Sequence, residues 1–408
     1  MNLPGIAVRG SVSALDTHAR AVLFDRATSA DPVVRERTAS IIARVRADGD
    51  DALRALAREF DGVVLESLEV PRAAWRDALA ALHPALRRAL ERSVTNIRQV
   101  HEAFRPVATE TTTADGVIIG RRPDPLGRVG VYAPGGRATY PSSLLMGVVP
   151  ARVAGVGEVI VCSPPGPGGL PSLVLLAAAE LADADRLFVV GGAGAVAAMA
   201  LGTATIPAVD RIVGPGNAYV AEAKAQVSSV TAIDAPAGPS ELLIIADDSA
   251  SPDVLTRELL AQAEHDPMAA VVLVATSATL LDAVERRLAD ELPREPRAQV
   301  IAAALAARGG MLLAASLAEA AAFANLWAPE HLLLAVRDPD ALMPSLRNAG
   351  TIFVGTCASV AFRLHDRRQS RAPHRRPSAR LVRAFHRRFL PVDDVAAHRA
   401  RCSGSAGQ

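Results

Sequence analysis

The chain has 408 residues, of which 50% are hydrophobic and 3% aromatic, so it is long enough for roughly two to three domains with sizeable cores. Lys and Arg total 44 against 43 for Asp and Glu, and this balance argues against a general polyanion binder such as a nucleic-acid-binding protein. Three scattered cysteines are too few for a disulfide framework or a thiolate metal site, which favours a cytoplasmic protein. Residues 1–20 do not resemble a secretory signal. Charged residues and Pro150 interrupt the apolar stretch 144–162, so no membrane segment is expected.

Two helices are expected first in chain order. Apolar residues recur at helical spacing over 31–60, where Asp31 is a candidate N-cap and Gly62 follows the end. A second run with the same period covers 77–104. These segments predict a helical entry to the fold.

From Gly127 onward, short β-type runs alternate with helical runs. Strands are expected at 128–133, 158–162, 186–190, 211–213, 241–246 and 270–274, and helices at 142–154, 172–181 and 195–200, with further helices that begin at Asp253 and Ala278. Such alternation is typical of βαβ units with parallel sheets. The sequence therefore predicts an α/β fold with two sheet units, which could be distant duplicates.

Three glycine-rich turns each follow an expected strand, namely Ala133–Gly136, Gly191–Gly194 and Gly214–Asn217. Open α/β sheets bind ligands at the carboxyl ends of their strands. The turn at Gly191 also precedes an alanine-rich helix, as a phosphate-binding turn does, but its spacing differs from the dinucleotide fingerprint. An ordinary tight turn is the alternative for each, whereas the three together favour a nucleotide-sized ligand.

Two clusters of acid, amide and histidine side chains are candidate sites of chemistry. Gln262 and His265 lie three apart on a helix expected over 253–265, so they project from one face and could share a metal. The alternative is a capped helix end, with His265 at the negative end of the helix dipole. Glu330 and His331 lie in an expected loop and could exchange protons near neutral pH, unless this is an ordinary surface loop.

Five ordered motifs resemble the histidinol dehydrogenase family: Gly127-Arg-Val-Gly-Val-Tyr-Ala-Pro-Gly-Gly136, Ile212-Val-Gly-Pro-Gly-Asn-Ala-Tyr-Val220, Ala237-Gly-Pro-Ser-Glu241, Leu260-Ala-Gln-Ala-Glu-His-Asp266 and Ala328-Pro-Glu-His-Leu332. The resemblance spans about residues 31–362. It implies two incomplete Rossmann-like units with parallel sheets, one inserted in the other, in a homodimer. The expected parts are an N-terminal segment 1–30, a first unit formed by 31–131 with 242–360, an inserted unit 132–241, and a tail 363–408.

The resemblance also implies a function, a zinc-dependent and NAD-linked oxidation of L-histidinol to L-histidine through L-histidinal in histidine biosynthesis. Carried over position by position, it assigns zinc to Gln262 and His265, NAD contacts to Tyr132 and Asn217, acid–base chemistry to Glu330 and His331, and substrate contacts to Ser240, Gln262, His265 and His331. Gly194 stands where the family usually has a glutamine that touches the cofactor. The expected ligands are small molecules, with no nucleic acid and no membrane.

The tail departs from the family after Phe362. The resemblance calls next for Gly-Asp-Tyr, whose aspartate is a zinc ligand, and later for Asn-His-Val-Leu-Pro-Thr-Gly-Gly, whose histidine lies at the substrate site. The distal histidine that completes the zinc site has no match either.

Codon degeneracy suggests an explanation for this departure. Read one base later, codons 363–364 can encode Asp-Tyr, codons 369–376 can encode the Asn-His motif, and codons 383–389 can encode Gly-Leu-Ser-Thr-Asp-Asp-Phe. We therefore expect residues 363–408 to be an out-of-frame tail. Its arginines are then a solvated segment rather than a nucleic-acid-binding arm.

Two other functions remain open. One is an impaired or inactive family remnant, since two zinc ligands of four bind the metal weakly. The other is a related NAD-dependent dehydrogenase that acts on a different polar alcohol.

Overall fold

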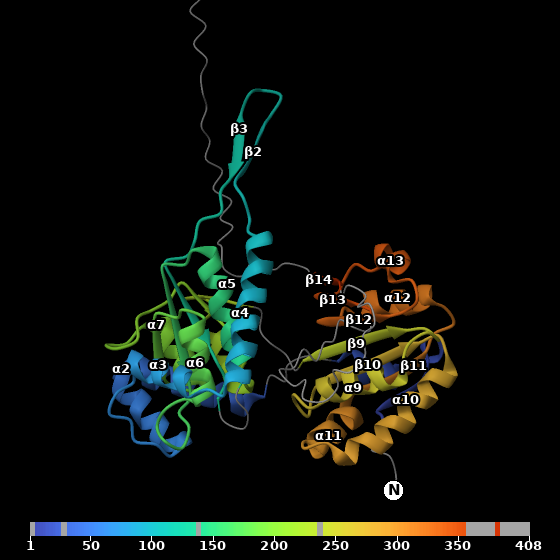
Figure 1. Ribbon diagram of the computed structural model, residues 1–408, viewed down its shortest axis with the longest axis horizontal. Helices are drawn as coiled ribbons and strands as arrows, with labels where there is room; N and C mark the ends of the chain where they lie inside the picture. Colours follow the sequence, from blue (N-terminus) through green and yellow to red (C-terminus); the bar gives the residue numbers. More distant parts are fainter. Residues whose placement is uncertain (1–4, 26–30, 136–139, 235–239, 356–379, 384–408) are drawn as a thin grey trace, which may run out of the picture. The chain divides into compact units, whose positions relative to one another are not determined.

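The computed structural model describes residues 5–25, 31–135, 140–234, 240–355 and 380–383. These residues form two compact units, one around a five-stranded sheet and one around a seven-stranded sheet (Figure 1). The five-stranded unit contains the described residues from 31 to 234. The seven-stranded unit contains residues 5–25 and those from 240 onward. The mixed α/β architecture with parallel sheets agrees with the sequence prediction.

The boundaries of the two units differ from the expected ones. Residues 31–131 do not join 242–360, because the strand β4 (Arg128–Tyr132) lies at the centre of the five-stranded sheet and the helices before it pack on helices of the same unit. Residues 5–25 are not a separate segment either. Their strand β1 (Val8–Ser11) pairs in parallel with β11 (Gly309–Leu313) of the seven-stranded sheet.

The five-stranded sheet is parallel and has the strand order β6-β5-β4-β7-β8. Its other strands are β5 (Glu158–Ser163), β6 (Arg186–Val189), β7 (Arg211–Val213) and β8 (Ala232–Ile233). From β4 the chain builds β5 and β6 on one side, then returns to build β7 and β8 on the other. The winding therefore reverses between β4 and β7, and ligands of open α/β sheets bind at the carboxyl ends of such a pair of strands.

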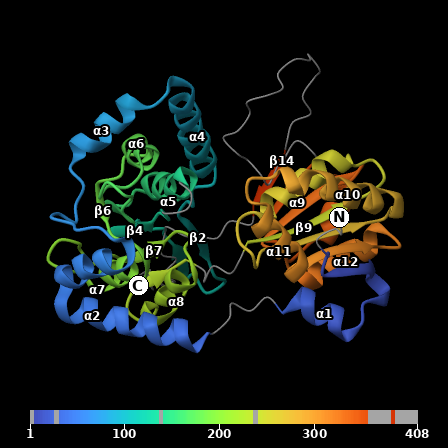
Figure 2. The ribbon, with the colours of Figure 1, turned by 90° about the horizontal axis from the view of Figure 1, so that it is seen from below.

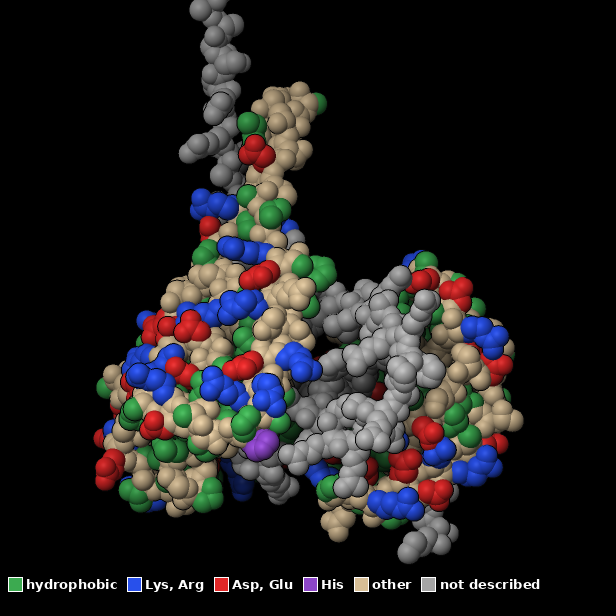
Figure 3. Space-filling view, in the orientation of Figure 1, with side chains coloured by type: hydrophobic (Ala, Val, Ile, Leu, Met, Phe, Trp, Pro, Cys, Tyr) green, Lys and Arg blue, Asp and Glu red, His purple; other side chains and the backbone are tan. Residues whose placement is uncertain are grey.

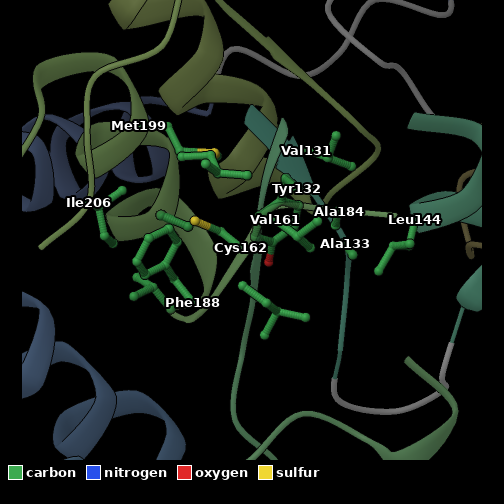
Figure 4. Packing of buried hydrophobic residues seen from close by; sticks show 14 of the residues in the cluster. Val131, Tyr132, Ala133, Leu144, Val161, Cys162, Ala184, Phe188, Met199 and Ile206 are labelled. Atoms are coloured by element: carbon green, nitrogen blue, oxygen red, sulfur yellow. The ribbon is translucent and has the colours of Figure 1, made fainter. Parts of the chain in front are cut away.

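Helices cover both faces of this sheet (Figure 2). One layer contains α3 (Arg72–Ala81), α4 (Pro84–Ala103), α5 (Pro141–Ala154) and α6 (Leu173–Leu181), and the other contains α2 (Pro32–Leu56), α7 (Gly192–Leu201) and α8 (Ala218–Val227). Cys162 on β5 and Phe188 on β6 lie in the core between these layers (Figure 4). Burial on both faces explains why these strands read as continuous apolar runs.

The first two helices refine the sequence prediction. Asp31 caps α2 as expected, since its carboxylate accepts a hydrogen bond from the Val33 amide at 2.9 Å. The helix expected over 77–104 is two helices, because Leu82 is extended and Pro84 opens α4 at its first turn. Proline is favoured at that position and unfavourable inside a helix.

The seven-stranded sheet has the order β1-β11-β10-β9-β12-β13-β14. Its remaining strands are β9 (Glu241–Ala246), β10 (Ala270–Ala275), β12 (His331–Ala335), β13 (Thr351–Val354) and the antiparallel β14 (Arg380–Arg383). The five strands from β9 to β13 follow the same winding as the five-stranded sheet, so here the reversal lies between β9 and β12. This shared strand order agrees with the expectation that the two units could be duplicates.

Residues of β9 alternate between two cores in the seven-stranded unit. Leu242 and Ile244 pack with α9 (Pro252–Ala263), α10 (Ala278–Glu291) and α11 (Ala298–Arg308), whereas Leu243 and Ile245 pack with α12 (Leu317–Trp327) and α1 (Thr17–Phe24). Trp327 ties the N-terminal segment to this second core, because its indole Nε1 donates a hydrogen bond to the Leu23 carbonyl at 2.8 Å. The segment just after Trp327 is thus held in place where it leads into β12.

A two-stranded hairpin projects from the five-stranded unit beyond α4 (Figure 1). It consists of β2 (Thr109–Thr112) and β3 (Ile118–Arg121). Three large apolar side chains in and before it are exposed, namely Phe104, Val107 and Ile119. A hairpin of this size is only marginally stable without a packing partner.

The surface carries charges of both signs. Figure 3 shows Lys and Arg side chains interspersed with Asp and Glu on the visible face of each unit, as the balanced composition predicts. No described helix combines the length and the apolar character needed to cross a membrane.

Candidate active site

The acid–base candidates lie at the amino edge of the seven-stranded sheet. Glu241 opens β9 and His331 opens β12, and the two strands pair in parallel with His331 opposite Leu242. Ser240 directly precedes β9, and its carbonyl accepts a hydrogen bond from the Ala270 amide at the start of β10. The parallel register therefore places residues from three distant segments along one sheet edge.

Two reciprocal hydrogen bonds join Glu241 and Glu330. The Glu330 amide donates to Glu241 Oε2 at 3.3 Å, and the Glu241 amide donates to Glu330 Oε2 at 3.4 Å. These bonds fix the backbone just before His331. Glu330 itself lies in an exposed bend just before β12, so its side chain faces solvent while its backbone is fixed.

A third hydrogen bond sets the tautomer of His331. Its Nδ1 lies 3.1 Å from the carbonyl oxygen of Glu241. A carbonyl oxygen only accepts, so Nδ1 must carry the hydrogen and the neutral ring keeps a lone pair on Nε2. That arrangement leaves Nε2 ready to accept a proton.

Strand β13 supports the pair from its other side. The Thr351 amide donates to the Glu330 carbonyl at 2.9 Å, and the ring of Phe353 lies 5.8 Å from that of His331 between centroids. Gly350 is required here, because a Cβ at this position would lie 2.8 Å from the Glu330 carbonyl oxygen. Glu330 and His331 are thus held by both neighbouring strands.

Gln262 and His265 lie at the carboxyl end of α9, in the same unit. The helix ends at Ala263, so His265 lies just past it and not on the helix as expected; its amide still donates to the Gln262 carbonyl at 3.3 Å. Although the side chain of His265 is exposed, nearby protein atoms partly desolvate its ring and lower its pKa; the positive charges of Arg297 and protonated His331 lower this pKa further, and Glu330 raises it. Glu330 and His331 are therefore among the charged groups that influence the pKa of His265.

Gln262 is the buried member of the expected metal pair. Its side chain is 4% exposed, and its Nε2 has no hydrogen-bond partner among the described residues. An unsatisfied buried amide is costly, and natural proteins keep such groups mainly at functional sites. The carboxyl end of a helix also favours a nearby cation.

Replacement of Gln262 by Met is expected to stabilise the metal-free protein by about 1 kcal/mol, because it removes a buried polar group that lacks a partner. Urea denaturation in the presence of a chelator measures this change. Gln226→Met is the matched control, since its amide donates to the Arg35 carbonyl and to Glu222 Oε1 and its loss should destabilise. A Gln262→Met protein that is less stable than wild type would contradict the interpretation.

The described residues supply only part of a zinc site. Gln262 and His265 offer an amide oxygen and an imidazole nitrogen, whereas structural and catalytic zinc sites use three or four protein ligands. Within the described ranges, no group of three or more His, Cys, Asp or Glu side chains is arranged to hold a metal. The tail residues 363–379 and 384–408, where the family's other ligands would fall, lie outside the described residues.

The expected NAD contacts lie in the five-stranded unit, at the carboxyl ends of β4 and β7. Tyr132 is 4% exposed, and its hydroxyl accepts a hydrogen bond from the Gly192 amide at 3.1 Å. Burial raises the pKa of Tyr132 to about 12, so the phenol stays neutral. Asn217 caps α8, because its Oδ1 accepts hydrogen bonds from the amides of Tyr219 and Val220, both at 3.1 Å.

The turn at Gly191–Gly194 has two features that the sequence did not reveal. The Gly192 amide, which would be available to a phosphate, already bonds Tyr132. Gly194 is buried, and a Cβ there would lie 3.1 Å from Leu56 Cδ1, so the position has little room for the family's glutamine side chain. The carboxyl ends of β4 and β7, where the strand order reverses, are therefore the better candidate for a ligand.

Glu241 is the site residue that the sequence analysis did not single out. It follows Ser240 in one of the family motifs, so its place in the motif was the available signal. Its contacts with Glu330 and His331 join residues 89 and 90 positions apart, which no local pattern could indicate.

Comparison with known proteins gives one consistent result. A family model described as histidinol dehydrogenase matches residues 24–363. Histidinol dehydrogenase from Chromobacterium violaceum is 46% identical over 339 residues, which cover 81% of this chain and 77% of that protein. The protein of the same name from Methanosarcina barkeri is 44% identical over 328 residues, or 80% of this chain and 76% of that protein.

A solved structure agrees with these sequence matches. The crystal structure of histidinol dehydrogenase from Elizabethkingia anophelis superposes with a TM-score of 0.81 at 30% identity, and the match covers 86% of this chain and 81% of that one.

Proposed function

Because this chain belongs to the histidinol dehydrogenase family, an oxidoreductase family of histidine biosynthesis, we propose that it oxidises L-histidinol to L-histidine through L-histidinal. Two NAD molecules would each accept one hydride in turn. The observation that carries the mechanism is the hydrogen bond from His331 Nδ1 to the Glu241 carbonyl, which leaves Nε2 unprotonated.

His331 and Glu330 would exchange the protons of both oxidations. In the first, Nε2 of His331 takes the hydroxyl proton as hydride leaves the adjacent carbon, which gives the aldehyde. Water adds to the aldehyde with loss of a proton to the same pair. The hydrate then loses a second hydride and a second proton to give the carboxylate. The exposed carboxylate of Glu330 would exchange protons with solvent, and its Oε2, 3.7 Å from His331 Nδ1, would stabilise the ring once Nε2 is protonated.

Gln262, His265 and Ser240 would orient the substrate. Gln262 and His265 would be two of the ligands of a zinc ion, which would hold the amino alcohol in place without redox chemistry. The position of both residues at the carboxyl end of α9, which favours a nearby cation, supports this assignment. Since the described residues provide only these two donors, the remaining ligands must come from elsewhere.

Tyr132 and Asn217 would line the NAD site at the carboxyl ends of β4 and β7. The reversal of strand order between these two strands favours this position, because dinucleotides bind at such a point in related α/β sheets.

The enzyme proposal is tested by NAD reduction with L-histidinol, with and without added zinc. Turnover that rises with zinc is expected if the metal pair is functional, and L-histidine should accumulate with two NADH for each substrate consumed. NADH binding without any turnover would instead support the alternative of an inactive family remnant. Turnover with another amino alcohol but not with L-histidinol would favour the related dehydrogenase.

The tail determines which of these outcomes applies to the chain as written. The family match ends at residue 363, where the out-of-frame tail is proposed to begin, and this agreement favours the frameshift hypothesis. Such a chain would lack two zinc ligands and a substrate-site histidine. We therefore expect little or no turnover until the frame is restored.

A homodimer in the cytoplasm completes the proposal. The exposed apolar side chains of Val107 and Ile119 at the β2–β3 hairpin favour a packing partner, and a second copy of this chain is the simplest candidate.

A further inference from the structure

Lys224 on α8 is buried and has no part in the chemistry above. Its side chain is 2% exposed, and its Nζ lies 2.6 Å from Asp234 Oδ1. The same Nζ donates to the carbonyl of Gly214, and Oδ2 of Asp234 accepts a hydrogen bond from the Gly214 amide at 2.8 Å. The buried Lys224–Asp234 ion pair is thus hydrogen-bonded to both the carbonyl and the amide of Gly214.

Gly214 occupies a crowded position. It follows β7 and has φ of +116°, a conformation that favours glycine. A Cβ at Gly214 would collide with the carbonyl oxygen of Tyr132, so the turn lies directly against the end of β4. The residue held by the ion pair is therefore the one where β4 and β7 meet at the reversal of strand order.

A contribution to overall stability does not explain why Lys224 and Asp234 are buried as an ion pair. Burial of two charges is costly, and apolar residues of similar size often serve as well or better. A buried pair has a clearer use when it fixes one conformation out of several. Here it links α8, the end of β8 and the first residue of the Gly214–Asn217 turn, which contains a second glycine and one proline.

We propose that Lys224 and Asp234 are positioning residues that fix the Gly214–Asn217 turn in the shape needed to bind a dinucleotide between β4 and β7. This inference rests on the proposed NAD-linked function. The ion pair contacts the turn through the backbone of Gly214, and the other residues of the turn remain available to the ligand.

The test compares NADH binding by the full chain and its variants, measured by fluorescence titration. Lys224→Met alone would leave a buried unpaired carboxylate and could unfold the protein. The double variant Lys224→Met/Asp234→Leu removes both charges and avoids this problem. Arg186→Met is the matched control, because it breaks an ion pair with Glu69 in the same unit, where Arg186 opens β6 at the opposite end of the strands.

The folded double variant is expected to bind NADH about tenfold more weakly or worse, since a small misplacement of a binding group has effects of that size. Amide hydrogen exchange should accelerate in the Gly214–Asn217 segment of the double variant, and Arg186→Met should change neither readout. A folded double variant with wild-type NADH affinity would overturn this inference but leave the proposed NAD-linked function intact. A wild-type chain that binds no NADH would overturn the proposed NAD-linked function and this inference with it.

Discussion

Insertion of two bases ahead of codon 363 is expected to raise histidinol turnover by about a hundredfold or more. Removal of a residue that only hydrogen-bonds to a metal ligand already lowers metal affinity or activity about 10–100-fold, so the return of a ligand itself should have at least that effect. The shift would restore the aspartate and the Asn-His motif that the family resemblance places in the tail. Zinc bound per chain should rise together with turnover. NADH absorbance measures the activity, and metal analysis of the purified protein measures the zinc.

A chain that ends at Phe362 is the control for this experiment. It lacks both the written tail and the restored one, so it separates the gain of ligands from the removal of a harmful segment. We expect it to be no more active than the chain as written. The frameshift hypothesis fails if the restored chain gains neither zinc nor turnover, or if the coding DNA contains codons that cannot encode the family motifs in the shifted frame.

Four of the five strands of the smaller sheet were predicted, but only β9 and β10 of the seven-stranded sheet. Residues 158–162, 241–246 and 270–274 appear as strands because parallel strands buried on both faces give uninterrupted apolar runs between glycine and proline. The sheet strands that were not predicted are β1, β8, β11, β12, β13 and β14. β1 is a short edge strand with one buried residue, and β12 begins at the very histidine that was expected in a loop.

The partition of the chain into units could not be read from the sequence. Residues 31–127 precede the first strand of the sheet to which they belong, and only the contacts of α2 and α4 with helices of residues 132–234 show that they pack there. The family resemblance gave a different partition. Amphipathic helices carry an apolar face but no information about which of two sheets receives it.

The candidate site was predicted mainly by resemblance. Spacing alone favoured a capped helix end over a metal site for Gln262 and His265, and the structure places them at a helix end with a buried amide that lacks a partner among the described residues. The tautomer of His331 was beyond prediction, because it depends on a carbonyl oxygen from β9. Chemistry of this kind depends on strand register, and register is a property of the folded sheet.

Replacement of His331 by Asn in the frame-restored chain is expected to lower kcat by about 10²–10⁴-fold, the usual contribution of a general base. An asparagine amide can still donate to the Glu241 carbonyl in place of Nδ1, so the strand edge should keep its shape while the proton acceptor is lost. Added imidazole should restore part of the rate. His18→Asn, the same change at an exposed position on α1, should leave kcat unchanged. A loss of kcat of only about threefold in His331→Asn would be much smaller than the usual effect of removing a general base. The proton acceptor would then be another group, and Glu330 would be the next candidate.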